Sequence, residues 1–427
     1  MPAAWLVGVL VLGSVLALFR VLPFLAKRGG DFANLHRGAA ALVAGESAFA
    51  RPELDYPPLV PLILAPLGLL PLAEARMVWL GLSLAALVAA LVAIWRLAGG
   101  DAAASCAIAA VLALDGSALP NLALGQLHPL LLLLLALALL LHSARPRLAA
   151  AAVGLAAALK IWPGLLLLSW LPWLPWLPRR RSPGGNDTLR TWVSGALTWA
   201  LLFILPWTVL VVATPPPHLP LAHGYWLGTP ALLNFSAPAA ALRASYGWEP
   251  GAALPDDWVA GVSASWSLTR ERQCISVVAS LLVLATGLAL LLLRVWRERW
   301  KAPAHSFAGA GGADVACALV ALALVAAPIS WYHYQLLQLP AFVLALAAAL
   351  RARRWPAALA IAAGVLTLTR HELVVSAVRL FAPDPTTALY FAGFVMPLLG
   401  AAWFASRVLA IGRGDGGDRD NGGAASR

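Results

Sequence analysis

The sequence has few charged residues and few cysteines, and both scarcities narrow what the chain can be. Only 11% of the 427 residues are Asp, Glu, Lys or Arg, whereas 61% are hydrophobic. A soluble domain of this size could not bury so much apolar surface, so the composition predicts a polytopic membrane protein. Cys106, Cys274 and Cys317 stand alone within or beside apolar segments, with the spacing of neither a metal site nor a disulfide framework.

Common functional motifs are absent from the sequence as well. It contains no Walker loop, no dinucleotide-binding fingerprint and no serine nucleophile elbow. The carboxylates of the loops show no spacing that specifies a Mg²⁺ or Mn²⁺ site. We therefore expect no cofactor, no bound metal and no soluble nucleotide as an energy source.

The net charge of +11 would suggest a nucleic-acid partner in a soluble protein. Here, however, the Lys and Arg residues lie mostly in short loops between apolar runs. Cations in such loops act as topology signals and contact lipid phosphates. We expect membrane lipids as partners and no nucleic acid.

The hydrophobic residues form runs of about 20 residues, the length that an α-helix needs to cross the hydrocarbon core of a bilayer. Outer-membrane barrels instead show alternating segments of about ten residues. The sequence therefore predicts an all-α polytopic membrane protein with about twelve transmembrane helices. The predicted spans are residues 4–25, 73–97, 102–118, 126–142, 147–160, 162–178, 192–213, 274–296, 313–328, 334–350, 355–371 and 387–410.

Basic residues gather at every second break between the predicted spans. Because cytoplasmic loops carry an excess of Lys and Arg, these breaks are predicted to be cytoplasmic, and the other loops are predicted to face the periplasm or the cell exterior. The chain is thus predicted to be a multi-pass protein of the inner (plasma) membrane. The basic breaks contain Arg96, Arg145 with Arg147, Arg179–Arg181, Arg294–Lys301 and Arg351–Arg354.

Residues 1–412 are predicted to form one transmembrane domain, and the Gly-, Asp- and Arg-rich residues 413–427 a disordered cytoplasmic tail. Two outer segments are long. Residues 27–71 form the first outer loop, whose apolar, proline-punctuated end (57–71) is too short to span and predicts interfacial helices. Residues 214–271 are rich in Pro, Gly, Trp and small polar residues and predict an outer lid loop.

The polar residues that packing explains least map to one level, on or just beneath the outer face. Ionisable residues at membrane depth are costly, and they usually line a pathway or a site. Six such residues from separate segments predict a polar cavity that opens outward. They are Asp31, Tyr56, Gln126, His128, Lys160 and His333.

Asp31 follows the pair Gly29-Gly30, which permits tight backbone geometry at the end of the first predicted span. Partly screened from water, its carboxylate would suit a general base that takes a proton from an acceptor hydroxyl. The alternative is that Asp31 caps the N-terminus of a helix over residues 32–43. The sequence leaves both interpretations open.

Lys160 lies in an apolar environment with no neighbouring acid, so it must snorkel to the interface, lose its proton or meet an anion. His333 is either part of the site or an ordinary histidine of the aromatic belt. The cations of the first outer loop, Arg37 among them, contradict the positive-inside bias. An anionic headgroup or phosphate would explain them, although a long loop also tolerates charge.

With these residues the chain resembles glycosyltransferase family 87, a group of integral-membrane enzymes of the GT-C superfamily that includes polyprenyl-phosphate-mannose-dependent mannosyltransferases. The matching pieces occur in family order along nearly the whole chain. They are Asp31-Phe32-Ala33-Asn34-Leu35-His36-Arg37-Gly38, Tyr56-Pro57-Pro58, Ala65-Pro66-Leu67, Gly125-Gln126, Ala158-Leu159-Lys160-Ile161-Trp162-Pro163 and Pro328-Ile329-Ser330-Trp331-Tyr332-His333.

The resemblance implies an inverting transfer of a sugar, expected to be mannose, from a polyprenyl monophosphate to a hydroxyl of a lipid or glycan acceptor on the outer side of the membrane. It makes Asp31 the base. It implies that Lys160, His333 and Arg37 bind the donor phosphate, whose developing charge they would stabilise as it leaves. Residues expected to bind substrate are Tyr56, Gln126, His128 and Trp331.

The sequence departs from the family pattern at three points, one of which is Phe49, where a tyrosine is common in the family. The family's Gly-Gln-x-Asn is Gly125-Gln126-Leu127-His128 here, and Tyr334 occupies the position of a second histidine after His333. The competing interpretation is a transporter or flippase of lipid-linked sugars, which needs phosphate-binding cations but no base.

Overall fold

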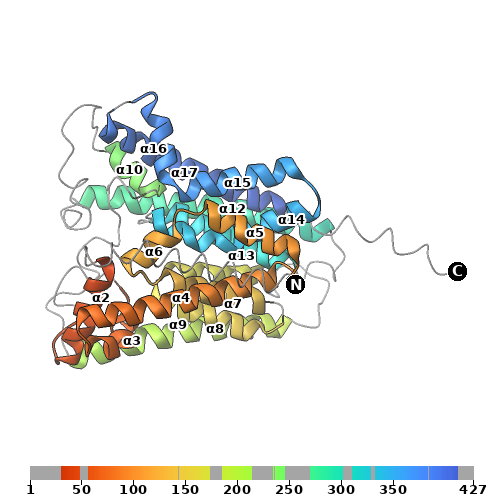
Figure 1. Ribbon diagram of the computed structural model, residues 1–427. Coiled ribbons are helices and arrows are strands. Elements are labelled where there is room, and N and C mark those ends of the chain that lie inside the picture. Colours follow the sequence, from red (N-terminus) through yellow and green to blue (C-terminus); the bar gives the residue numbers. More distant parts are fainter. Residues whose placement is uncertain are drawn as a thin grey trace.

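The computed structural model describes residues 30–48, 56–142, 144–173, 185–213, 234, 236–245, 270–301, 310–327, 332–382 and 384–411. Within these ranges the elements are helices, and most of them run side by side (Figure 1). Four expected features lie outside the described residues: the first predicted span, most of the lid loop 214–271, Trp331 and the tail 413–427.

The helices α2 to α9 make up the N-terminal half. They are α2 (Gly30–Val43), α3 (Leu59–Gly68), α4 (Leu72–Leu97), α5 (Ala102–Leu114), α6 (Ala118–Leu124), α7 (His128–Leu141), α8 (Pro146–Leu159), the 3₁₀-helix η1 (Trp162–Trp173) and α9 (Gly185–Ala213). The C-terminal half contains α10 (Ala237–Ser245), α12 (Arg270–Lys301), α13 (Ala310–Ala326), the 3₁₀-helix η6 (Tyr332–Gln338), α14 (Leu339–Arg351), α15 (Trp355–Thr369), α16 (His371–Arg379) and α17 (Pro385–Ala410).

The all-α prediction is confirmed within the described ranges, and the helices suit a multi-pass membrane protein. The count of twelve spans is not confirmed. Four described helical stretches are long and apolar enough to cross a membrane, or up to six if each of two bent pairs is one span. Several other predicted spans form shorter helices. For example, α7 and α8 have 14 residues each, about 21 Å, which is less than the ~30 Å of the hydrocarbon core.

Small residues let the helices of the N-terminal half approach closely. On α8 the side chains of Ala149, Ala150 and Ala156 are fully buried, and α8 packs against α7 and α9. A methyl group added at Gly154 would lie 2.5 Å from the carbonyl oxygen of Gly195 in α9. Close backbone contact of this kind holds helices together where lipid removes the hydrophobic driving force between them.

The segment predicted as the first outer loop contains two packed helices, α2 and α3. Gly68 at the end of α3 lies against the backbone of Ala39 and Ala40, so close that a Cβ there would be 2.7 Å from backbone atoms. The imidazole of His36 is in hydrogen-bond contact through Nε2 with the carbonyl oxygen of Leu70 at 2.9 Å. These contacts fix α2, and with it Asp31, against α3 and the segment that follows it.

Two helices break and turn at the same place in the bundle. The axes of α5 and α6 differ by 61°, and those of α15 and α16 by 86°. The breaks are joined, because Gly116 N donates to Thr369 Oγ1 at 3.1 Å and Arg370 Nε donates to the Leu114 carbonyl at 2.9 Å. The carboxylate of Asp115, at the end of α5, accepts a hydrogen bond from the N–H of Ala118, the first residue of the short helix α6, at 2.7 Å. The end of α6 is thereby held in position.

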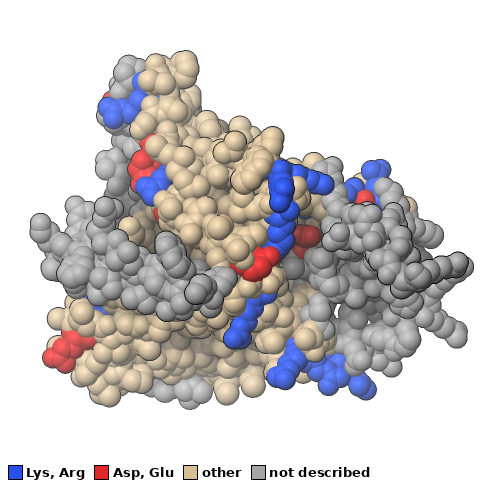
Figure 2. Space-filling model, turned by 45° about the vertical axis from the view of Figure 1, so that its right-hand side comes forward, with Lys and Arg blue, Asp and Glu red and all other residues tan. Residues whose placement is uncertain are grey.

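Basic residues lie at the helix ends where the sequence predicts cytoplasmic breaks. Arg96 is in the last turn of α4, and Arg351 in the last turn of α14. Figure 2 shows several Lys and Arg side chains on the face that is brought forward from the right-hand side of Figure 1. Arg351 also forms an ion pair with Asp101, the N-cap of α5, at 2.7 Å, so part of this charge holds two helices together.

Candidate active site

The site is built where four helix ends meet: the first turn of α2, the turn from α6 to α7, the end of α8 and the start of η6. Because α7 and α8 pack together and are joined by a short connection, the beginning of α7 and the end of α8 lie at the same end of the pair. These ends carry His128 and Lys160. We call the five residues Asp31, Tyr56, Gln126, Lys160 and His128, together with Tyr334, the polar cluster.

Gly125 shapes the turn that delivers Gln126. It ends α6 in the left-handed conformation, with φ +68°, which glycine adopts without steric cost. Its carbonyl accepts a hydrogen bond from Trp79 Nε1 at 2.9 Å, and the Trp79 ring stacks on Phe32 with centroids 5.8 Å apart. A Cβ at Gly125 would lie 2.5 Å from Phe32 Cβ, so α2 approaches this turn as closely as glycine permits.

Asp31 lies in the first turn of α2, directly before Phe32. Its carboxylate oxygen Oδ2 accepts a hydrogen bond from Gln126 Nε2. The side chain therefore reaches across to the α6–α7 turn, as a site residue would, and its described partner is not the first-turn backbone that an N-cap residue binds. The N-terminus of α2 still favours the charged carboxylate through the helix dipole.

Gln126 is buried, and its amide oxygen Oε1 accepts a hydrogen bond from the Tyr56 hydroxyl at 2.8 Å. Tyr56, Gln126 and Asp31 thus form a continuous hydrogen-bonded chain from three separate segments. The predicted convergence of these residues at one level is a direct contact in the structure.

Lys160 follows the last residue of α8 in an extended conformation, φ −156° and ψ 119°. Its Nζ lies 3.2 Å from His128 Nε2 and 3.7 Å from the centroid of the Tyr334 ring. The rings of His128 and Tyr334 are themselves in contact, with centroids 4.4 Å apart. A histidine and the face of a tyrosine therefore hold the ammonium group, and Lys160 does not snorkel away from the cluster.

Burial and charge shift both ionisable groups. Burial raises the pKa of Asp31, while the hydrogen bond from Gln126 and the charge of Lys160 act in the opposite direction. Burial lowers the pKa of Lys160 to about 7, against the attraction of the Asp31 carboxylate. A carboxyl with a raised pKa beside a lysine with a lowered pKa is the pattern of a site that moves protons or binds an anion.

The structure thus brings together five of the eight residues predicted for the site. Arg37 is not among them: its side chain is exposed and donates to Asn34 Oδ1 on the same helix. His333 is placed by its backbone in the first turn of η6, next to Tyr334.

The sequence analysis noted Tyr334 only as a departure from the family pattern. The signal that marks it is its position directly after the motif that ends at His333.

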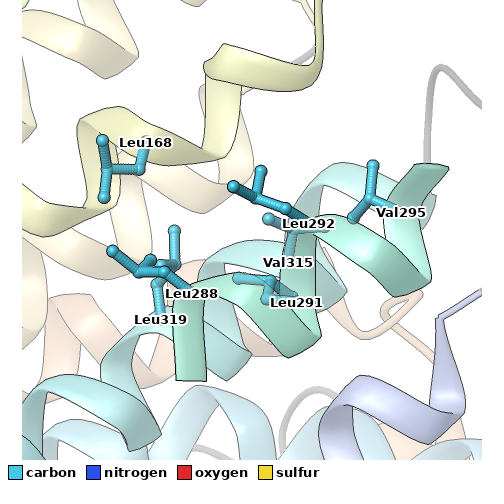
Figure 3. Close-up of a pocket in the computed structure, with 7 residues that line it drawn as sticks. All are labelled: Leu168, Leu288, Leu291, Leu292, Val295, Val315 and Leu319. Atoms are coloured by element: carbon cyan, nitrogen blue, oxygen red, sulfur yellow. The ribbon is translucent and has the colours of Figure 1, made fainter. Parts of the chain in front are cut away.

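The described residues also show whether a metal could bind and where an apolar recess lies. Among the residues that the structure describes, no three His, Cys, Asp or Glu side chains gather where they could bind a metal ion. An apolar recess lies elsewhere, between η1, α12 and α13 (Figure 3), and only leucine and valine side chains line it. None of its lining residues belongs to the polar cluster. The lining residues are Leu168, Leu288, Leu291, Leu292, Val295, Val315 and Leu319.

Comparison with protein families identifies a family that this chain matches. Residues 54–313 match the model of Glycosyltransferase family 87, a range that contains every residue of the polar cluster except Asp31 and Tyr334. No curated protein matches the sequence.

Proposed function

Because the chain belongs to glycosyltransferase family 87, and so is a membrane glycosyltransferase, we propose that it transfers a sugar, mannose, from a polyprenyl monophosphate donor to a hydroxyl of a lipid or glycan acceptor. The observation that carries the proposal is the polar cluster. It sets a carboxylate able to take a proton beside a cation able to hold a phosphate. Both groups are needed for this transfer, and they come from helices far apart in the sequence.

In the proposed reaction the oxygen of the acceptor hydroxyl attacks C1 of the donor sugar from the face opposite the phosphate. The bond from C1 to the phosphate oxygen breaks as the new glycosidic bond forms, so the configuration at C1 inverts. The electron pair of the broken bond leaves with the polyprenyl phosphate. Asp31 accepts the proton of the hydroxyl as general base. Because burial raises the pKa of this carboxyl, it is a stronger base than an exposed aspartate.

The proposed role of Lys160 is to hold the donor phosphate. The phosphate gains negative charge when it leaves, and a cation fixed in advance at that point stabilises the transition state more than the ground state. The anion would also raise the pKa of Lys160 from about 7 and keep the lysine protonated. His333 remains a proposed phosphate contact, and His128 and Trp331 remain proposed substrate contacts. Arg37 is not included, because its exposed side chain bonds to Asn34 on the same helix and lies outside the polar cluster.

We place the site on the outer side of the inner membrane. Arg145 precedes α8 and Arg147 lies in its first turn, at the end of the α7–α8 pair opposite His128 and Lys160. The excess of cations at that opposite end supports a cytoplasmic location for it. The polar cluster would then face the periplasm or the exterior, where a lipid-linked donor and not a soluble nucleotide sugar delivers the sugar.

The experiment that tests this function is a product assay with several donors. Protein reconstituted in vesicles is incubated with radiolabelled polyprenyl-phosphate mannose, glucose or galactose and with lipid extracts as acceptors. A new mannosylated product, sensitive to an enzyme that cleaves α-mannosides, is expected from the mannose donor. Movement of the labelled lipid across the bilayer without any new glycosidic product would instead indicate the transporter or flippase of the competing interpretation.

A further inference from the structure

The hydrogen-bonded chain from Tyr56 through Gln126 to Asp31 has a fixed direction. An ionised carboxylate only accepts hydrogen bonds, so Gln126 must present its NH₂ group to Asp31. The amide oxygen then faces Tyr56, and it can only accept, so the tyrosine hydroxyl must donate. The ionised Asp31 carboxylate therefore fixes the orientation of the Gln126 amide, and the amide fixes the Tyr56 hydroxyl as a donor.

Only one of the two carboxylate oxygens of Asp31 takes part in this hydrogen-bonded chain. Oδ2 accepts the bond from Gln126 Nε2. In the part of the chain that the structure describes, no hydrogen bond to the other oxygen, Oδ1, occurs. A carboxylate with one oxygen held and the other open is oriented for a single proton transfer.

We propose that Gln126 is a positioning residue for Asp31, that Tyr56 fixes its amide, and that Oδ1 of Asp31 is the atom that receives the acceptor proton. The inference rests on the proposed function. It also replaces the substrate-binding role that the sequence suggests for Tyr56 and Gln126. After transfer the proton sits on Oδ1, and the bond from Gln126 to Oδ2 is kept, so the base can return its proton without losing its orientation.

Gln126 also acts on the charge of the base. A hydrogen bond to the ionised form favours that form, so this bond opposes the burial that raises the pKa of Asp31. Among the described elements packed against α2, α3 and α6 carry no titratable side chain, and α4 brings Glu74 and Arg76 in its first turns. Helix α2 itself carries His36 and Arg37, and Lys160 is the described charge that acts on Asp31. Removing the Gln126 donor should therefore raise the pKa of Asp31 further.

The test measures kcat, the donor KM and the pH dependence of kcat for Gln126→Met and Tyr56→Phe in reconstituted vesicles. Gln126→Met keeps the length of the side chain and removes both amide groups. We expect kcat to fall by at least about 10-fold, the donor KM to stay close to that of the unmodified protein, and the acid limb of the kcat profile to move up by about one pH unit. Tyr56→Phe frees the amide and should shift the limb in the same direction by less.

Leu127→Met is the matched control, because it alters the neighbouring buried residue and leaves the hydrogen-bonded chain intact; its pH profile should not move. An unshifted acid limb in Gln126→Met, or a raised donor KM with kcat retained, would overturn the inference. If Gln126→Met does not fold, an unshifted acid limb of the kcat profile in Tyr56→Phe would overturn the inference instead. These outcomes leave the proposed function intact. Turnover retained by Asp31→Asn would instead remove Asp31 as the base, and only the absence of a new glycosidic product from the unmodified protein would remove the proposed function.

Discussion

Arg243 of α10 donates a hydrogen bond through Nη2 to the backbone carbonyl of Gly393 in α17, at 2.8 Å. In a regular helix that carbonyl would accept from the N–H of the residue four positions later, but here that residue is Pro397, which has no N–H. The lack of a side chain at Gly393 lets the guanidinium approach, because a Cβ there would lie 2.5 Å from Nη2. Arg243 is fully buried, and it ties α10 to α17.

Arg243→Met should therefore lower the free energy of unfolding by about 1–3 kcal/mol, since it leaves the Gly393 carbonyl buried without its donor. Thermal unfolding of the detergent-solubilised protein measures the change. Pro397→Ala restores the helical N–H, so the same Arg243→Met substitution should cost clearly less in that background. Equal losses in both backgrounds would show that the carbonyl of Gly393 is not what Arg243 stabilises.

Gly125→Ala should disrupt the site more than it disrupts the fold. The added methyl meets Phe32 Cβ at 2.5 Å and sits on a backbone with φ +68°, so either the turn or α2 must shift. We expect transfer activity to fall by at least about 10-fold, because misplacement of a catalytic group by about 1 Å can cost 10²-fold, while the protein still purifies as a folded species.

The control for that substitution is Gly81→Ala in α4, where a Cβ meets no atom within 4 Å. Alanine in a helix interior should leave activity unchanged and raise stability slightly. Full activity in Gly125→Ala would mean that the close approach of α2 to the α6–α7 turn does not position Asp31.

The activity should also depend on the protonation of Lys160. Its pKa in the free protein is about 7, so the ammonium cation is present below that pH and is lost as the pH rises through it. The kcat/KM for the donor should therefore decline above about pH 7. At low pH it should fall again as Asp31 takes up a proton, and this fall should begin above the ordinary range of an aspartate because burial raises the pKa of Asp31.

Lys160→Arg separates the deprotonation of Lys160 from the titration of other groups, because arginine stays charged over the whole pH range of the assay. The decline above about pH 7 should disappear in this variant, even if its maximal rate is lower. Lys160→Met should weaken donor binding at every pH. A decline that persists unchanged in Lys160→Arg would assign the alkaline limb to another group.

That Asp31, Gln126 and Lys160 lie near one another could be predicted from the sequence, but their contacts could not. Asp31, Gln126 and Lys160 each lie at the end of an apolar run, and the alternation of basic breaks assigns those ends to one side. Hydropathy says nothing about the direction in which a side chain leaves its helix, so the bond from Gln126 to Asp31 could not be derived. Arg37 shows the same limit: six residues after Asp31 is about 240° around a helix, and its side chain turns away from the cluster.

The bends in the bundle could not be predicted from hydropathy. The predicted spans 102–118 and 355–371 end close to the breaks after α5 and α15, but hydropathy does not show that α6 and α16 continue as helices at a large angle. The breaks depend on tertiary bonds such as that from Gly116 N to Thr369 Oγ1, whose partners are 253 positions apart. Tyr334 was missed because an aromatic residue near a membrane interface is expected in any case.

The central claim is that Asp31 is the base of the transfer, and Asp31→Asn tests it most directly because it keeps the size of the side chain. Donor binding and a single turnover of transfer are measured on the same reconstituted protein. The control is Asp384→Asn, whose carboxylate caps α17 by accepting from Thr387 N at 2.7 Å, a cap that asparagine also provides.

Donor affinity should stay close to that of the unmodified protein in both variants. Transfer should fall by about 10²- to 10⁴-fold in Asp31→Asn and remain unchanged in Asp384→Asn. Turnover at the unmodified rate in Asp31→Asn, with the donor bound as before, would contradict the account.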